Sequence, residues 1–298
     1  MSIKVVLIDG YIDDPAALGV PPYISPIARA VAGAAIDAGG DVEYITIDMI
    51  RRGHRIPDAK VSVLISGNTV PGKYIRSMPM SLKEIESILP QLKGWKLIGG
   101  SAASSEIAKK FDFAIEKDLA ASLYDGMTGK EVDERHRTLE EWNRWMLLGA
   151  SIVEQHQDHP DPLIAEIESY RGCHRYASGG CSYCIEPLKG KPLMRPPEDI
   201  LAEARELKKH GISSDGKYAV QLQASDYDKY DYFIGMDTMN IRNMKRILSS
   251  DNKIYKMMTF AGRSDDVSDP WYSGDFRKAY NDIEEGCIGL LEFLKDKL

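Results

Sequence analysis

The sequence lacks the features of a membrane protein or a nucleic-acid-binding protein. No uninterrupted apolar run approaches the roughly 18 to 20 residues that a membrane-spanning helix requires. No cluster of lysine or arginine offsets the formal net charge of -7 at pH 7, so we expect neither a nucleic-acid partner nor a membrane partner. The N-terminal apolar run has no small-residue cleavage site after it, unlike a signal peptide. We therefore expect a cytoplasmic protein that acts on a small molecule or on another protein.

Cysteine is scarce and unevenly distributed. The 298 residues contain 4 cysteines, and three of them, Cys173, Cys181 and Cys184, lie close together in the sequence. Disulfides are disfavoured in the cytoplasm, so this cluster predicts metal ligands or catalytic groups. Three thiolates can hold three irons of a cubane iron-sulfur cluster and leave the fourth iron open to an exchangeable ligand. A zinc site that adds His174 or His159, or surface cysteines without a metal, are the alternatives.

The first 115 or so residues alternate strand-like and helix-like segments, which predicts a parallel sheet covered by helices. Helix starts are indicated by Ser25 before Pro26, by Ser81 with Glu84, and at Ala103. The expected strands are residues 3–8, 42–47, 61–65, 96–98 and 111–115. We expect a Rossmann-like domain whose ligands bind at the carboxyl ends of the strands, where Asp9, Asp48, Gly67 and Gly99 fall.

The rest of the chain divides at residues 158–162, a proline-rich break. Before the break, Thr138 starts a capped helix that runs to Gly149; after it, a strand over 163–167 leads into the cysteine loop. The segments expected beyond the loop are a helix over 197–210, strands over 232–236 and 254–259, a helix capped by Asp237, and a last helix whose apolar face places Cys287 in the core. We expect domains at 1–150, 160–205 and 206–298.

The strand, cysteine loop and helix resemble the opening β-α unit of radical S-adenosylmethionine proteins. The usual family spacing of three then two residues between cysteines is seven then two here, and Gly179 and Gly180 lie inside the longer gap. This arrangement resembles a branch of archaeal radical S-adenosylmethionine proteins that carry a cobalamin-binding-like N-terminal domain, and the resemblance covers residues 1 to about 205.

The resemblance implies a set of cofactors and site residues. Cys173, Cys181 and Cys184 would hold a [4Fe-4S] cluster, and S-adenosylmethionine would bind its free iron for radical chemistry on an unknown substrate. Gly179, Gly180 and Tyr183 would contact S-adenosylmethionine, with Tyr183 near its adenine. An electron donor that reduces the cluster is the implied partner.

Cobalamin is a further possible cofactor by the same resemblance. Base-off cobalamin proteins present an Asp-x-His-x-x-Gly loop, and the nearest candidate is the segment from Asp48 to Gly53. Ile50 stands where the histidine should be, and His54 is displaced. Either cobalamin binds with another axial arrangement, or the domain keeps the fold without the cofactor.

Residues from about 203 to 298 resemble a different family, the C-terminal two-thirds of low-molecular-weight protein-tyrosine-phosphatases. The matching segments, in family order, are 231–237, 240–243, 267–276 and 285–291. The resemblance implies that Asp269 is the general acid and that Trp271 and Tyr272 line the pocket mouth. The mechanism also needs a Cys-x5-Arg loop, and none of the four cysteines has an arginine six positions on. We therefore expect no useful phosphatase activity.

Together the two resemblances predict a chimera joined near residues 206–211. The expected fold class is α/β: a Rossmann-like parallel sheet domain, a truncated radical S-adenosylmethionine β-α unit, and a partial phosphatase-like α/β segment. By resemblance, a radical S-adenosylmethionine barrel repeats the β-α unit about six times. Only the first unit precedes the phosphatase-like residues here, so we expect a truncated barrel. A non-catalytic fusion or binding protein is the remaining alternative.

Overall fold

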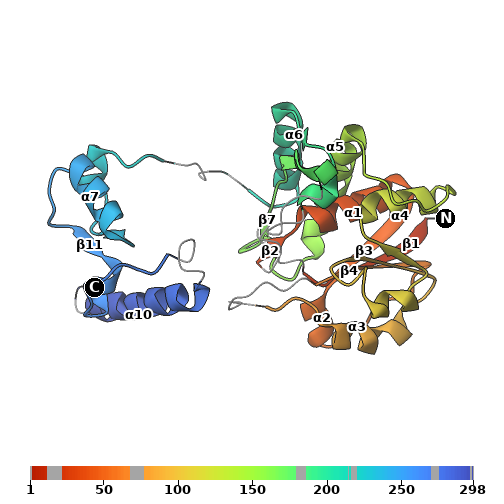
Figure 1. Ribbon diagram of the computed structural model, residues 1–298, viewed down its shortest axis with the longest axis horizontal. Helices are drawn as coiled ribbons and strands as arrows, with labels where there is room; N and C mark the ends of the chain where they lie inside the picture. Colours follow the sequence, from red (N-terminus) through yellow and green to blue (C-terminus); the bar gives the residue numbers. More distant parts are fainter. Residues whose placement is uncertain are drawn as a thin grey trace. The chain divides into compact units, whose positions relative to one another are not determined.

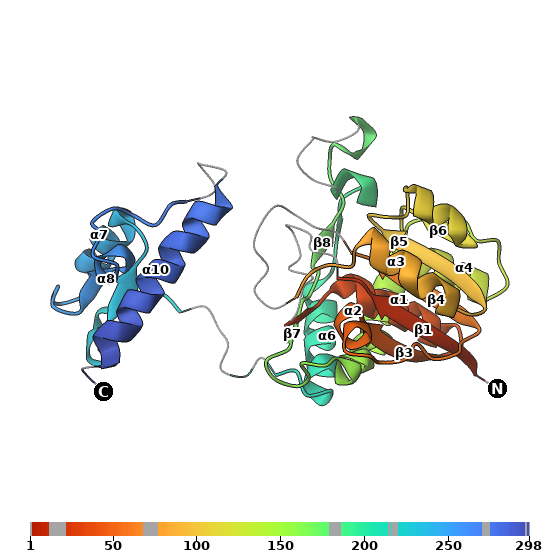
Figure 2. The same ribbon diagram turned by 90° about the horizontal axis from the view of Figure 1, so that it is seen from below.

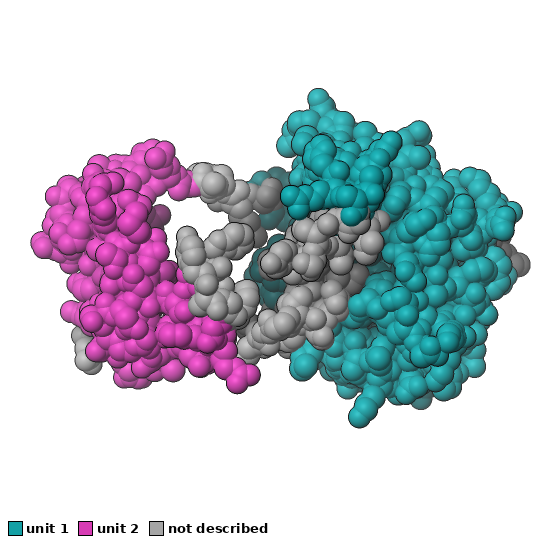
Figure 3. Space-filling view, viewed as in Figure 1, with its two compact units in different colours: residues 1–70, 74–215 teal, residues 71–73, 216–298 magenta. Residues whose placement is uncertain are grey.

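The computed structural model describes residues 2–11, 22–67, 77–178, 186–213, 215, 220–269, 275–295 and 297. These residues form two compact units, one ending at Asp215 and one made of the residues that follow it (Figure 3). No helix of the described residues is long and apolar enough to cross a membrane.

A five-stranded parallel sheet forms the centre of the first unit (Figures 1 and 2). Its strands, in spatial order, are β3 (Gly40–Thr46), β1 (Ile3–Asp9), β4 (Val61–Ser66), β5 (Trp95–Gly100) and β6 (Phe113–Ile115). The inner strands are apolar runs buried on both faces, as parallel strands covered by helices are. The expected fold class, an α/β protein with a Rossmann-like parallel sheet, is confirmed.

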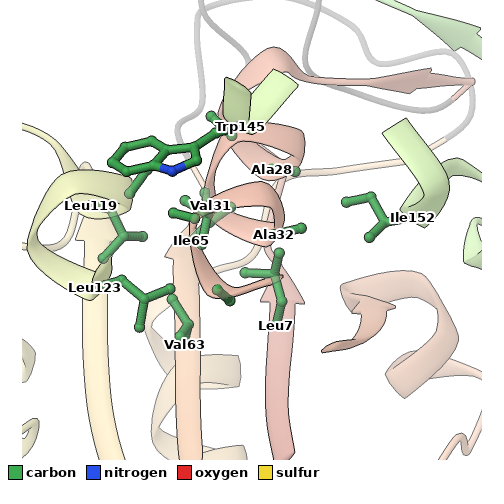
Figure 4. Packing of buried hydrophobic residues seen from close by; sticks show 14 of the residues in the cluster. Leu7, Ala28, Val31, Ala32, Val63, Ile65, Leu119, Leu123, Trp145 and Ile152 are labelled. Carbon is green, nitrogen blue, oxygen red and sulfur yellow. The ribbon is translucent and has the colours of Figure 1, made fainter. Parts of the chain in front are cut away.

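Helices cover both faces of this sheet (Figure 1). One face packs against α1 (Pro26–Asp37), α4 (Leu119–Met127) and α5 (Leu139–Leu148), and the other against α2 (Ile47–Arg51) and α3 (Leu82–Ile88). Strand side chains alternate between the two cores, so Leu7 faces α1 and Ile8 faces the opposite side. Figure 4 shows α1 enclosed between the sheet and Trp145 of α5.

Most helix starts agree with the sequence prediction. The Ser25 hydroxyl accepts from the Ala28 N–H at 3.2 Å, and capping boxes begin α3 at Ser81 and α5 at Thr138.

The helix predicted from Ala103 is wrong. Ser66 Oγ accepts from the Ala102 N–H, which holds this segment in a turn, and only a 3-10 helix over Glu106–Lys110 follows. The other 3-10 helices are Leu89–Gln91, Gly149–Gln155, Tyr176–Ser178, Glu186–Lys189 and Ala224–Asp228.

The cysteine-loop segment belongs to the first unit. The strand predicted over 163–167 is reduced to β7 (Ile164–Ala165), which pairs in parallel with β2 (Tyr23–Ile24). The loop itself is closed by an antiparallel pair, β8 (Tyr170–Arg171) with β9 (Leu193–Met194), and α6 (Pro197–Lys209) follows. Helix α6 ends as predicted, with Gly211 at a φ of +86°.

The second unit is a small α/β segment. Two parallel strands, β10 (Phe233–Gly235) and β11 (Ile254–Lys256), pair with each other. The helices are α7 (Thr238–Ile247), α8 (Met257–Phe260) and α10 (Phe276–Lys295). Asp237 caps α7 as predicted, but the strand predicted over 254–259 stops where α8 begins.

Helix α10 packs on α8 through its glycines. A Cβ on Gly289 would lie 1.9 Å from the Phe260 carbonyl oxygen, and one on Gly286 would lie 2.6 Å from Met257. Helix α10 therefore turns its glycine side toward α8, and Cys287 is exposed. The prediction that Cys287 lies in a core is wrong, because apolar spacing alone did not reveal that glycines form the contact.

Candidate functional site

The cysteine loop begins on a fixed base. A Cβ on Gly172 would lie 2.3 Å from the Lys191 carbonyl oxygen, and its φ is +83°, so this position requires glycine. The Cys173 N–H donates to the Gly190 carbonyl oxygen at 3.0 Å, and Cys173 Sγ accepts from the Arg175 N–H at 3.4 Å. Cys173 is half-buried and forms no disulfide. One of the three predicted ligands is thus held where β8 ends.

The other predicted residues of this loop, Gly179, Gly180, Cys181, Tyr183 and Cys184, lie outside the described residues. Within the described part of the chain, no three His, Cys, Asp or Glu side chains are arranged to hold a metal ion. Of the histidines in the zinc alternative, His174 is exposed, and His159 Nε2 lies 2.7 Å from the His210 carbonyl oxygen. The assignment of the three cysteines as ligands stays a prediction.

A cavity of about 680 Å³ lies between the cysteine-loop base and the carboxyl ends of β4, β5 and β6. Its buried floor consists of Ile65, Ile115, Asp118, Leu119, Arg137 and Arg171. More exposed side chains surround the floor, including Ser101, Ser104, Lys117, Glu134, Glu168 and Lys189. Its volume is typical of small-molecule sites, and its place at the carboxyl edge of a parallel sheet is where α/β proteins bind ligands.

Three ionised groups meet in this floor. Asp118 caps α4, and its carboxylate accepts from Arg137 Nε at 2.7 Å and from Arg137 Nη2 at 2.8 Å. Arg171 Nη1 lies 3.3 Å from the same carboxylate. Burial alone would raise the pKa of Asp118, but the two arginines outweigh burial and lower this pKa to about 2. The group therefore carries two positive charges and one negative charge.

A second buried charge group joins α6 to the sheet domain. Glu203 of α6 binds Arg29 of α1 at 2.5 Å and also binds Arg195, and all three side chains are fully buried. The guanidinium carbons of Arg195 and Arg171 each lie 5.3 Å from the centroid of the Trp142 ring. Both ends of the cysteine-loop segment are therefore fixed to the sheet domain by buried arginines.

Asp9, expected on the ligand face, ends β1 as predicted. Its carboxylate is 1% exposed and accepts from the Tyr44 hydroxyl at 2.8 Å and the Tyr11 N–H at 2.9 Å. Burial raises the pKa of Asp9 to about 6, against the lowering effect of these hydrogen bonds. Gln157 Nε2 donates to the Tyr11 hydroxyl at 2.9 Å, which extends the polar cluster.

The segment proposed for cobalamin begins in a helix. Asp48 and Ile50 lie on α2, and the Asp48 carboxylate accepts from Arg51 Nη1 at 2.9 Å. His54 follows in an exposed position.

In the second unit, Asp269 is exposed. The chain just before it is held in place, because the Ser268 N–H donates to Asp282 at 3.1 Å and the Val267 N–H donates to the Met236 carbonyl oxygen at 2.9 Å. Trp271 and Tyr272 lie outside the described residues.

Sequence reasoning missed the three charged residues of the cavity floor. Asp118 is separated by 19 residues from Arg137 and by 53 from Arg171, so no local spacing connects them. The available signal was Asp118 itself, a helix-capping residue directly before the apolar segment that forms α4.

Comparison with known proteins identifies the C-terminal part of the chain. Residues 197–298 match the family model of low molecular weight phosphotyrosine protein phosphatases. The low molecular weight protein-tyrosine-phosphatase YfkJ of Bacillus subtilis is 36% identical over 108 residues, which cover 35% of this chain and 68% of YfkJ. The chain therefore belongs, through these residues, to the low molecular weight phosphotyrosine protein phosphatase family.

Archaeal proteins match larger parts of the chain. An uncharacterized protein of Methanocaldococcus jannaschii is 39% identical over 231 residues, which cover 70% of this chain and 42% of that protein. The chain spans less than half the length of this relative and of a second one from Archaeoglobus fulgidus, with 42% and 45% covered. The structure of the radical S-adenosylmethionine methyltransferase TsrM from Kitasatospora setae aligns with a TM-score of 0.45 at 15% identity, covering 71% of this chain and 46% of TsrM. A similarity of this size defines neither fold nor function.

Proposed function

We propose that the first unit is an iron-sulfur protein of the radical S-adenosylmethionine type. Cys173, Cys181 and Cys184 hold a [4Fe-4S] cluster in this proposal, and Gly179, Gly180 and Tyr183 contact S-adenosylmethionine. The observation that carries the proposal is the position of Cys173, half-buried at the base of a cysteine-rich loop beside a cavity of about 680 Å³. When bound, the cluster supplies one electron to the sulfonium of S-adenosylmethionine, and the electron comes from a separate donor.

The described residues fit a metal-bound thiolate at Cys173. The Arg175 N–H points at Cys173 Sγ, and this backbone hydrogen bond orients the sulfur that would bind the metal. The Gly190 carbonyl oxygen fixes the Cys173 backbone, so that the sulfur stays at the loop base. The buried pair of Asp118 and Arg171 holds β8, two residues before this cysteine, against the sheet domain.

Cobalamin is left out of this proposal. Ile50 has no metal-binding atom, and the segment that would present an axial histidine begins as helix α2.

The test is anaerobic reconstitution with iron and sulfide, followed by addition of S-adenosylmethionine. We expect a broad visible absorbance from thiolate-to-iron charge transfer, and a change in the electron paramagnetic resonance spectrum of the reduced cluster when S-adenosylmethionine binds. A folded chain that takes up no iron would exclude the proposal. If a cluster forms but its spectrum does not change when S-adenosylmethionine is added, the first unit would be an electron-transfer protein instead.

The second unit suggests a second, non-catalytic function. It belongs to a phosphatase family and contains Asp269, but the chain has no Cys-x5-Arg sequence that could supply the nucleophile and its phosphate loop. We infer that this unit binds a partner or is carried as a fusion rather than hydrolysing phosphotyrosine.

A further inference from the structure

The second unit buries little of its apolar surface. In its described residues, the buried hydrophobic side chains are Phe233, Leu248, Met257, Met258 and Ala279. The two hydrophobic cores on either side of the five-stranded sheet consist of first-unit residues alone. A small α/β unit normally folds around a core of its own, so the second unit has apolar surface left for a further element to cover.

Helix α10 carries part of this uncovered surface. Its glycine side packs on α8, while an apolar stripe is exposed, which we call the α10 stripe: Ile283, Cys287, Ile288 and Leu291. Residues 283, 287 and 291 are spaced by four residues, so they lie on one face of the helix. Contiguous exposed apolar surface of this kind marks an interaction site.

The sheet of the second unit is also incomplete. Among the described residues, β10 and β11 pair only with each other, and no residue of α7 is buried. Two strands alone are too few for an independently stable sheet, and parallel strands are normally buried on both faces. A free strand edge can be extended by a strand from another polypeptide.

The similarity to the phosphatase family indicates what is missing. The residues of this chain that match YfkJ cover 68% of that protein and leave the rest of YfkJ without a counterpart. Because the resemblance is to the C-terminal two-thirds of the family, the unmatched part is the N-terminal segment. A second copy of the chain has the same match, so it offers no such segment.

We propose that the second unit docks the N-terminal segment of a low molecular weight phosphatase supplied by another polypeptide. A strand of that segment extends the sheet of β10 and β11, and an apolar helix face covers the α10 stripe. The inference rests on the non-catalytic function proposed for this unit and names the partner that the unit binds.

The first test mixes the full chain with the unmatched N-terminal segment of YfkJ, prepared as a separate peptide, in isothermal titration calorimetry. Intact YfkJ is the control, because its own C-terminal part already occupies that segment. We expect the peptide to bind at least about tenfold more tightly than intact YfkJ, and amide hydrogen exchange in β10 and α10 to slow at least about tenfold in the complex.

Two outcomes separate the inference from the function on which it rests. No binding of the peptide would overturn the inference and leave the non-catalytic function standing. Turnover of para-nitrophenyl phosphate by the chain alone would overturn the non-catalytic function, and the inference with it.

The second test locates the peptide. Leu291→Gln should weaken binding at least about tenfold, because it removes apolar surface from the α10 stripe. Leu291 is 60% exposed, so the substitution should leave the folded unit intact. Leu82→Gln is the matched control and should bind like the wild type, since Leu82 is 54% exposed on α3 of the first unit.

Undiminished binding by Leu291→Gln, or equal weakening by Leu82→Gln, would place the peptide elsewhere and contradict the proposal. Sedimentation of the chain alone tests the other occupant. A dimer of the wild type that Leu291→Gln abolishes would assign the α10 stripe to a second copy and overturn the choice of a phosphatase segment.

Discussion

Arg171 Nη1 lies 3.3 Å from the Asp118 carboxylate, which connects the strand before the first loop cysteine to the N-terminus of α4. Asp118 is also held by two hydrogen bonds from the Arg137 guanidinium, and its side chain is fully buried. The cysteine loop is therefore attached to the sheet domain by ionised groups that must stay paired. Stability of the first unit and geometry of the loop depend on the same carboxylate.

The first prediction concerns this carboxylate. Asp118→Asn removes the buried carboxylate that accepts from Arg137 and Arg171, and removal of one member of a buried charge group costs about 3 to 5 kcal/mol of unfolding free energy. Urea unfolding of the two chains measures the loss. Glu106→Gln is the control, since its pair with Lys109 is largely exposed and should contribute little. A loss at Asp118 no larger than at Glu106 would show that the buried group is not needed for stability.

The second prediction concerns pH. Burial raises the pKa of Asp9 from 3.8 to about 6. Between these two pH values the folded state keeps the proton on Asp9, whereas the unfolded state has released it. The stability contributed by protonated Asp9 is present below about pH 4 and is lost as the pH rises through 6. In Asp9→Asn this dependence should disappear, and the variant should gain on the order of 3 kcal/mol relative to the wild type between pH 4 and pH 7. A stability difference that stays constant over this range would contradict the raised pKa.

The third prediction concerns helix packing. A Cβ on Gly33 would lie 1.9 Å from the Trp145 carbonyl oxygen, so Gly33→Ala should push α1 away from α5 and cost roughly 1 to 3 kcal/mol. Ser87→Ala, on an exposed turn of α3, should change stability by much less. Thermal unfolding of both variants makes the comparison. A Gly33→Ala chain as stable as the wild type would mean that the two helices are not in close contact.

The fourth prediction concerns the phosphatase-family unit. The chain should not turn over para-nitrophenyl phosphate above the level of the uncatalysed reaction, because it has no Cys-x5-Arg nucleophile. Asp269→Ala should therefore leave the measured rate unchanged. Turnover that is lost in Asp269→Ala would restore the phosphatase interpretation.

The sequence was informative where a local rule decides the structure. Hydrophobic runs and capping residues such as Ser25, Ser81 and Thr138 predicted the parallel sheet and the starts of three helices. The prediction failed where a contact between residues distant in the sequence determines the local structure, as at Ala102, whose N–H donates to Ser66 Oγ. The cavity floor could not be predicted for the same reason, because Asp118 and Arg171 come together only when the sheet has folded.

The most direct test of the account is the iron content of single-cysteine variants after anaerobic reconstitution. The account predicts that Cys173→Ser, Cys181→Ser and Cys184→Ser each lose most of the iron and the visible absorbance. Cys287→Ser, an exposed position on α10, should keep both. Full iron uptake by Cys173→Ser, or loss of iron in Cys287→Ser alone, would contradict the assignment of the cysteine loop as the cluster site.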